Sequence, residues 1–296
     1  MRRIDAHVHL YPPEVGRDPA GWAAANGEAH WAELCTRRRR DGRPVQAFPS
    51  LDELLRDMDA AGIERAVLQG WYWERPATCT AQNRFYATCI HGHPDRLSAF
   101  ATIHPAGGET AVLAEIRLAH AEGLAGLGEL SPHSQGGAGD PVLDAALALA
   151  GELRLPVNFH VSDPQARHYH GKVDTPLEDF RGLARRHPDV RFILAHWGGG
   201  LLFQETNPAV RSELARVLYD TAASPLIYDD RIWRAALDVV PPDKVLFGSD
   251  YPLVLYPKVA ERPGWHEILA EVGGVDLSDR EKDAVLGGSA AALLGL

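Results

Sequence analysis

Six side chains that can bind a divalent metal recur near the ends of short apolar segments along the chain. They are His7, His9, Glu129, His160, His196 and Asp250. Imidazole nitrogens and carboxylate oxygens are the usual ligands of catalytic zinc, which lowers the pKa of a bound water to about 7. The set therefore predicts metal-dependent chemistry on a small molecule through an activated water.

The first two candidate ligands stand one residue apart in the sequence IDAHVHL, residues 4–10. Side chains at positions i and i+2 of a strand point to the same side, so His7 and His9 would form half of a metal site. Alone this pair is weak evidence, because two polar residues on an exposed edge strand give the same pattern. Burying all six polar groups without compensation would be costly, and a metal ion is the natural compensation. The remaining alternative is that the six side chains form a merely polar surface that binds no metal.

Eight apolar, β-rich segments alternate with helical patterns. They are residues 4–10, 63–70, 97–105, 124–130, 155–161, 190–200, 217–224 and 245–252. Between the first two, residues 51–62 have apolar side chains at helical spacing, with Ser50 as N-cap and Gly62 as stop. This alternation predicts right-handed βαβ units and, with eight of them, a (β/α)8 TIM barrel. A doubly wound open sheet is the alternative, but no GxGxxG sequence follows the first segment.

In such a barrel the carboxyl ends of all strands meet at one mouth, where loops carry function. The six candidate ligands lie at these ends. Alternation along each segment places Leu127 on the face of Glu129, and Leu194 on the face of His196. We therefore expect each polar side chain to point into the mouth together with its apolar partners.

Composition limits the remaining possibilities. The chain has 296 residues, 45% of them hydrophobic, which allows a large core and one or two domains. The eight alternating units predict a single barrel domain over 1–296, with a loop insertion at residues 11–49 after the first strand. A net charge of -10 argues against nucleic-acid binding, and no apolar run approaches the ~20 residues of a membrane span. Three cysteines without CxxC spacing favour a reducing cytoplasm. The expected partner is a small-molecule substrate, and a homo-oligomer is left open.

Five motifs in order, DAHVHL, VNFHVSD, LAHWGGG, YDTAAS and FGSDYP, resemble the strand-end signatures of the amidohydrolase superfamily. Within it the chain looks like the amidohydrolase-related (amidohydrolase 2) group, and the resemblance covers essentially the whole sequence. It implies a barrel holding one or two divalent metals, with zinc favoured and manganese as the alternative. Some members of the family hydrolyse amides, lactones and esters, and other members decarboxylate or hydrate unsaturated or aromatic acids.

The resemblance also implies roles for individual residues. It puts His7, His9 and His160 on the tighter metal. Asp250 matches a ligand that takes the proton of the attacking water. His196 matches a residue that polarises the substrate in one-metal members and binds the second ion in two-metal members.

Hydrolysis is the expected reaction. Glu129 matches a position where some relatives carry a bridging carboxylate, and a sixth ligand leaves room for two metals. Asp250 and His196 are the expected catalytic residues, one moving a proton and the other stabilising negative charge on the substrate oxygen. A metal-dependent decarboxylase or hydratase is the alternative. A non-enzymatic metal-binding barrel is less favoured, because a structural zinc site needs only four ligands.

Two groups of residues are candidates for substrate binding. Trp71 and Tyr72 follow the second strand and could wall a pocket, or simply pack between barrel and helix. His168, His170 and Lys172 lie on the long polar loop after the fifth strand. They could bind a substrate carboxylate or act as a lid, or form an exposed loop without such a role.

Overall fold

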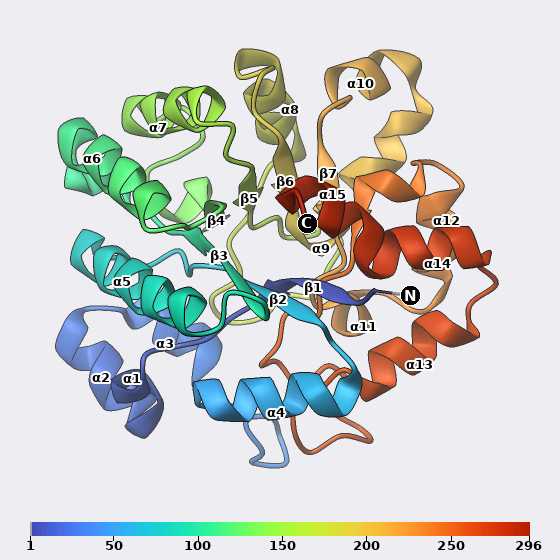
Figure 1. Ribbon diagram of the computed structural model, residues 1–296, viewed down its shortest axis with the longest axis horizontal. Coiled ribbons are helices and arrows are strands. Elements are labelled where there is room, and N and C mark those ends of the chain that lie inside the picture. Colours follow the sequence, from blue (N-terminus) through green and yellow to red (C-terminus); the bar gives the residue numbers. More distant parts are fainter. Residues whose placement is uncertain (1) are drawn as a thin grey trace.

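Eight parallel strands form a nearly closed barrel in the computed structural model, which describes residues 2–296 (Figure 1). The strands pair in chain order: β1 (Ile4–Val8), β2 (Arg65–Leu68), β3 (Leu97–Ala101), β4 (Gly126–Leu130), β5 (Val157–Phe159), β6 (Phe192–Leu194), β7 (Leu218–Asp220) and β8 (Val245–Leu246). The chain beyond β8 returns to β1 through a parallel bridge between Val8 and Tyr251. The amide of Ala6 also donates to the Phe247 carbonyl at 2.7 Å. The predicted (β/α)8 barrel is confirmed.

Helices surround the barrel (Figure 1). The larger ones are α4 (Leu51–Ala61), α5 (Pro76–Gly92), α6 (Glu109–Ala121), α7 (Pro141–Glu152), α8 (Leu177–Arg186), α10 (Pro208–Glu213), α12 (Arg231–Leu237), α13 (His266–Gly274), α14 (Asp279–Asp283) and α15 (Ser289–Leu294), with one-turn α9 (Ala195–Gly198) and α11 (Ser224–Ile227). The boundaries of α4 follow its sequence. Ser50 and Glu53 form a reciprocal capping box, and Gly62 ends the helix with a φ of 68°. Both predicted ends of this helix are confirmed.

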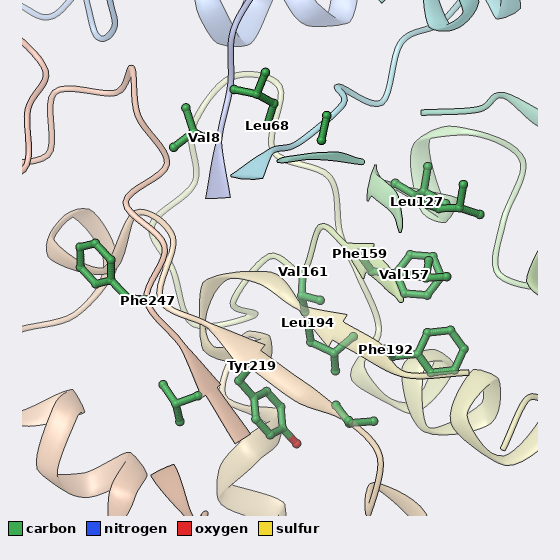
Figure 2. Packing of buried hydrophobic residues seen from close by; sticks show 14 of the residues in the cluster. Val8, Leu68, Leu127, Val157, Phe159, Val161, Phe192, Leu194, Tyr219 and Phe247 are labelled. Carbon is green, nitrogen blue, oxygen red and sulfur yellow. The ribbon is translucent and has the colours of Figure 1, made fainter. Parts of the chain in front are cut away.

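Two apolar layers hold the barrel together. The outer layer lies between strands and helices, and Figure 2 shows its members spread around the ring of strands, among them Val8, Leu68, Leu127, Phe159, Leu194 and Phe247. A separate inner cluster joins residues of five strands, Ile4, Val67, Phe100, Ile193 and Leu246, to Ala290 and Ala291 of α15. Since α15 packs against these inward-facing residues, it closes the amino end of the barrel.

The predicted alternation is wrong in two strands. Leu127 and Leu194 pack in the outer layer, whereas Glu129 and His196 point into the mouth. In β4 the pairing with β5 is irregular between Leu127 and Leu130, which turns Glu129 inward. After β6, His196 adopts a left-handed φ of 58°, so regular strand parity no longer applies to it.

The segment after β1 is more structured than a loop insertion. It contains α1 (Pro13–Arg17), α2 (Pro19–Asn26) and α3 (Ala29–Cys35). Tyr11, Trp31 and Cys35 from this segment form an aromatic-rich cluster with Trp71 and Trp73, which follow β2. An isolated bridge between Gln46 and Leu253 also ties it to the chain after β8. The segment therefore forms a small helical cap beside the carboxyl end of the barrel.

The three cysteines, Cys35, Cys79 and Cys89, are buried and unpaired. None of the helices in residues 2–296 combines the length and the apolar character needed to cross a membrane.

Candidate metal centre

The six candidate ligands come together at the carboxyl end of the barrel. Five of them form two overlapping groups, within each of which the ligand atoms lie no more than 4.8 Å apart: His7, His9 and Glu129, and Glu129, His160 and His196. Glu129 belongs to both groups. Asp250 lies alongside, with Oδ1 3.4 Å from Nε2 of His9. The chain thus builds a cluster of four imidazoles and two carboxylates from residues far apart in sequence.

Three of the imidazoles are oriented by acceptors outside the cluster. The Nδ1 atoms face Asp220 Oδ2 in His7 (2.9 Å), the Gln69 carbonyl in His9 (3.0 Å) and the Ala222 carbonyl in His196 (2.9 Å). Because each partner can only accept, the proton of each neutral ring sits on Nδ1. When the rings are neutral, as metal binding requires, the Nε2 atoms carry lone pairs that point into the cluster.

These lone pairs meet at short range. Nε2 of His7 lies 3.2 Å from Nε2 of His9, and Nε2 of His196 lies 3.6 Å from Oε1 of Glu129. Lone pairs this close repel one another unless a positive charge lies between them. Imidazole and carboxylate are also the ligand types of divalent metal sites in proteins. The donor set therefore fits a divalent metal ion.

The pKa values of the carboxylates and histidines in the cluster also indicate that the site favours positive charge. Burial by itself raises the pKa of Glu129, Asp220 and Asp250, but the surrounding histidines outweigh it and lower all three. Burial lowers the pKa of His7 and His196, yet the carboxylates raise them to about 10 and about 9. A divalent cation would satisfy these carboxylates as protons on the histidines do.

Asp220, which sequence reasoning left without a role, links the two groups. This fully buried carboxylate ends β7 and accepts from His7 Nδ1 and Asn158 Nδ2, both at 2.9 Å. Its other oxygen accepts from the backbone amides of His196 (3.2 Å) and Ala222 (3.0 Å). The signal was present in YDTAAS, because this aspartate stands at a strand end like the ligands. It orients one imidazole through its side chain and another through its backbone.

A further missed carboxylate, Asp5, lies within β1. It is fully buried and accepts from the amides of His7 and Ser249, the Ser249 hydroxyl and the Trp265 indole. Burial raises its pKa to about 6, even though these donors oppose the shift. Asp5 thereby joins β1 to the chain after β8, on which Asp250 stands.

His160 lies beside Glu129 and His196 in the cluster. Its Nδ1 is 3.0 Å from Oε1 of Glu129 and 3.3 Å from Nε2 of His196, and its Nε2 is 3.2 Å from the Ser162 hydroxyl. The structure groups it with His196, and not with His7 and His9. Burial lowers the pKa of His160 despite the Glu129 carboxylate, which keeps this ring neutral.

Backbone strain collects at the same place. His196, Trp197 and Asp250 have φ values of 58°, 58° and 67°, in the left-handed region that favours glycine. The Asp250 amide donates to the His7 carbonyl at 2.9 Å, which holds the strained turn against β1. Such residues persist where the surrounding structure fixes them, and they cluster at functional sites.

An aromatic wall, Trp71 and Tyr72, borders the cluster. Their rings stack on each other with centroids 4.5 Å apart. Trp71 also packs edge-on against His9, and Tyr72 packs at a tilt against His160, each with centroids 5.1 Å apart. Both are buried, so they pack within the cap as well as beside the ligands.

The structure does not bring the three predicted loop residues into the cluster. The Lys172 ammonium donates to the carbonyls of Asp163 and Ala166 and so braces its own loop. The His170 side chain is 88% exposed, and His168 is exposed beside it.

Another residue of this loop, Tyr169, lies closer to the site. Burial raises its pKa, which Asp250 and Glu129 also raise through their charge. The Arg37 guanidinium, from the cap, lies 5.0 Å from the centre of its ring. Nε of Arg37 is buried and has no hydrogen-bond partner among residues 2–296. Neither residue was among the predicted site residues.

Comparison with known proteins adds a family and a set of similar folds. A family model described as "Amidohydrolase" matches residues 4–296. The chain resembles 5-carboxyvanillate decarboxylase from Sphingomonas paucimobilis, with 18% identity and a TM-score of 0.72 over 100% of this chain and 99% of the other. The 5-carboxyvanillate decarboxylase from Novosphingobium aromaticivorans, with manganese and 4-hydroxy-3-methoxy-5-nitrobenzoic acid, has 17% identity and a TM-score of 0.73 over 100% of this chain and 96% of the other. The 2,6-dihydroxybenzoate decarboxylase from Rhizobium has 18% identity and a TM-score of 0.68 over 100% of this chain and 99% of the other.

Proposed function

The chain belongs to the amidohydrolase family, and we propose that it is a metal-dependent decarboxylase of an aromatic or unsaturated carboxylic acid. The observation that carries this proposal is the aromatic wall of Trp71 and Tyr72 against His9 and His160. A planar acid can stack on such a wall beside the cluster. Similar structures bear the names of decarboxylases of 5-carboxyvanillate and 2,6-dihydroxybenzoate. This similarity supports decarboxylation better than the hydrolysis that the sequence favoured.

The proposed cofactor is a divalent ion, zinc or manganese, since imidazole donors suit zinc and carboxylate donors suit manganese. Its proposed holders lie on either side of Glu129: His7, His9 and Asp250 on one side, His160 and His196 on the other. Bound there, the ion supplies positive charge that offsets the buried carboxylates and withdraws electrons from substrate oxygens.

Arg37 is the proposed partner of a substrate carboxylate. Its guanidinium lies over Tyr169 at the edge of the site, and its Nε lacks a partner within residues 2–296. A guanidinium binds a carboxylate through two parallel hydrogen bonds, which would fix the plane of an aromatic acid. The Tyr72 ring would pack against the face of the substrate's aromatic ring.

Asp250 is the proposed proton carrier. Burial raises its pKa, but the hydrogen bond from His9 and the charges of His7 and His196 lower it below its usual range. It is therefore ionised at rest and can take a proton from a substrate hydroxyl or from water. Asp250 then gives that proton to the carbon that bears the carboxylate. The carbon–carbon bond breaks, its electron pair returns to the ring, CO2 leaves, and Asp250 is again ionised.

Hydrolysis is the second candidate, and one observation favours it. Glu129 belongs to both groups of candidate ligands, as a carboxylate shared by two ions would. Two-metal sites are used to activate water and to stabilise a leaving oxygen. Asp250 would then take the proton of the attacking water and pass it to the leaving group.

Product analysis tests the proposal. The protein, loaded in turn with zinc and with manganese, is supplied with 5-carboxyvanillate, 2,6-dihydroxybenzoate, a lactone and an amide. Decarboxylation releases CO2 from an acid and, in deuterium oxide, leaves deuterium on the carbon that lost it. Turnover of the lactone or amide with ¹⁸O from labelled water in the product, and no CO2 from either acid, would overturn the proposal in favour of the second candidate.

A further inference from the structure

A cavity rich in arginine lies at the end of the barrel away from the metal centre. Its volume is about 660 Å³. It lies between the end of α7 and the residues that lead into β5, β6 and β7, at the amino ends of those strands. Four arginines line it: Arg154, Arg186, Arg191 and Arg216.

Most of these cations have no partner among the residues that the structure describes. Within residues 2–296, Arg154, Arg191 and Arg216 make no ion pair and no side-chain hydrogen bond, while Arg186 pairs with Asp144 at 3.2 Å. Only two carboxylates, Glu152 and Asp189, line the same cavity. A local excess of positive charge is unexpected in a chain of net charge -10. It indicates attraction for an anion from outside the chain.

The backbone at Arg154 gives a second observation. Arg154 follows α7 with a left-handed φ of 57°, and the next amide, of Leu155, donates back to Ala150 at 2.8 Å. The same turn ends α6, where the left-handed position is Gly123, with a φ of 89°. Glycine is preferred there because it has no Cβ to clash. At the end of α7 the chain instead holds a long cation that lines the cavity.

The floor of the cavity is apolar. Leu147, Leu155 and Val190 are buried and line it beneath the arginines. These side chains are 0%, 6% and 3% exposed, so this floor offers a carbon skeleton a small apolar contact and the arginines supply most of the binding.

We propose that this cavity binds a small organic anion carrying at least two phosphate or carboxylate groups. Guanidinium groups recognise both chemistries through paired hydrogen bonds. The apolar floor of Leu147, Leu155 and Val190 takes the carbon skeleton. The site is separate from the metal centre, so it stands whether or not the decarboxylase proposal holds.

Calorimetric titration of the full-length protein with two probes tests this site. Fructose 1,6-bisphosphate tests the phosphate source and tricarballylate the carboxylate source, each against sodium chloride of equal ionic strength. The variants are Arg154→Gly and Arg216→Gln. The matched control is Arg117→Gln, which removes one charge from an exposed, unpaired arginine on α6. The Asp250→Asn variant shows whether either probe binds at the metal centre instead of the cavity.

At least one probe is expected to bind above the chloride control. Arg154→Gly and Arg216→Gln should each weaken it by at least about tenfold, the effect of losing one charged hydrogen-bonding group. Arg117→Gln and Asp250→Asn should bind like the wild type. Arg154→Gly should melt at the same or a higher temperature, because glycine accepts the left-handed φ. Absence of binding by both probes, equal weakening in Arg117→Gln, or full binding by both cavity variants would overturn the proposal.

Discussion

The two ends of the barrel bury opposite kinds of side chain. At the amino end, Ile4, Phe100 and Leu246 pack against Ala290 of α15 in an apolar cluster. At the carboxyl end, the buried side chains include the six candidate ligands together with Asp220 and Asp5. The left-handed turns at His196 and Asp250 lie at this second end.

This difference indicates that the amino end mainly stabilises the fold, whereas the carboxyl end holds the groups that can do chemistry. Burying apolar surface stabilises by roughly 25 cal/mol per Å² and needs no particular partner. Burying a charge costs free energy unless an opposite charge or donors offset it. Residues such as Glu129 and Asp220 are therefore costly to fold unless they serve a ligand, as expected for the carboxyl end of a barrel enzyme.

Asp250→Asn should give the largest effect on activity. The amide keeps the shape of the carboxylate but cannot carry a proton, so turnover per metal-loaded site should fall by a factor of about 10² to 10⁴. Steady-state kinetics measures this on protein of known metal content. The unfolding free energy of the metal-free variant should fall less than that of a core truncation, because no apolar side chain is removed. Turnover within a factor of about two of wild type would remove Asp250 from the proton step.

Phe100→Ala should produce the opposite pattern. It deletes a fully buried ring from the inner cluster and should lower the unfolding free energy by about 3–5 kcal/mol. Urea unfolding at a fixed metal concentration measures this. The metal content and the turnover of the folded fraction should stay unchanged. Loss of metal without loss of stability would break the proposed division between the two ends.

Asp220→Asn should act through the histidines that it orients. It removes the carboxylate that accepts from His7 Nδ1, and metal affinity should fall by a factor of roughly 10 to 100. Competition with a fluorescent chelator reports this affinity. Asp144→Asn, on a partly buried carboxylate that pairs with His187 away from the metal centre, is the matched control and should bind as wild type does. Equal affinity in both variants would mean that Asp220 is only structural.

Removing the metal should make stability depend on alkaline pH. The pKa of His7 rises from 6.5 to about 10 in the folded, metal-free site. The charged His7 stabilises the folded protein fully below about pH 6.5, its pKa in the unfolded chain. This stabilisation is lost as the pH rises towards 10, its pKa in the folded protein. Metal-free protein should therefore lose stability between pH 7 and 10, and metal-loaded protein should lose less. Melting curves in matched buffers compare the two, and parallel pH profiles would contradict the exchange of protons for metal.

The barrel and the positions of the candidate ligands followed from sequence, because strand alternation and strand-end polar residues are local patterns. The side-chain directions of Glu129 and His196 did not. They depend on the irregular β4 pairing and on the left-handed turn after β6. Asp220 was visible in sequence but had no role, because its partners come from β1, β5 and the turn after β6. The position of Arg37 over Tyr169 joins two irregular segments, whose packing no periodicity encodes.

Anomalous diffraction from crystals of the zinc-loaded protein shows whether the cluster of candidate ligands holds a metal ion. We expect a peak about 2.0–2.2 Å from Nε2 of His7, Nε2 of His9 and an oxygen of Glu129. A second peak on the side of His196 would identify Glu129 as a bridge. Full zinc loading with no peak among these atoms, and Glu129 bonded only to protein, would contradict the claim that the buried charges of the mouth exist to hold a metal.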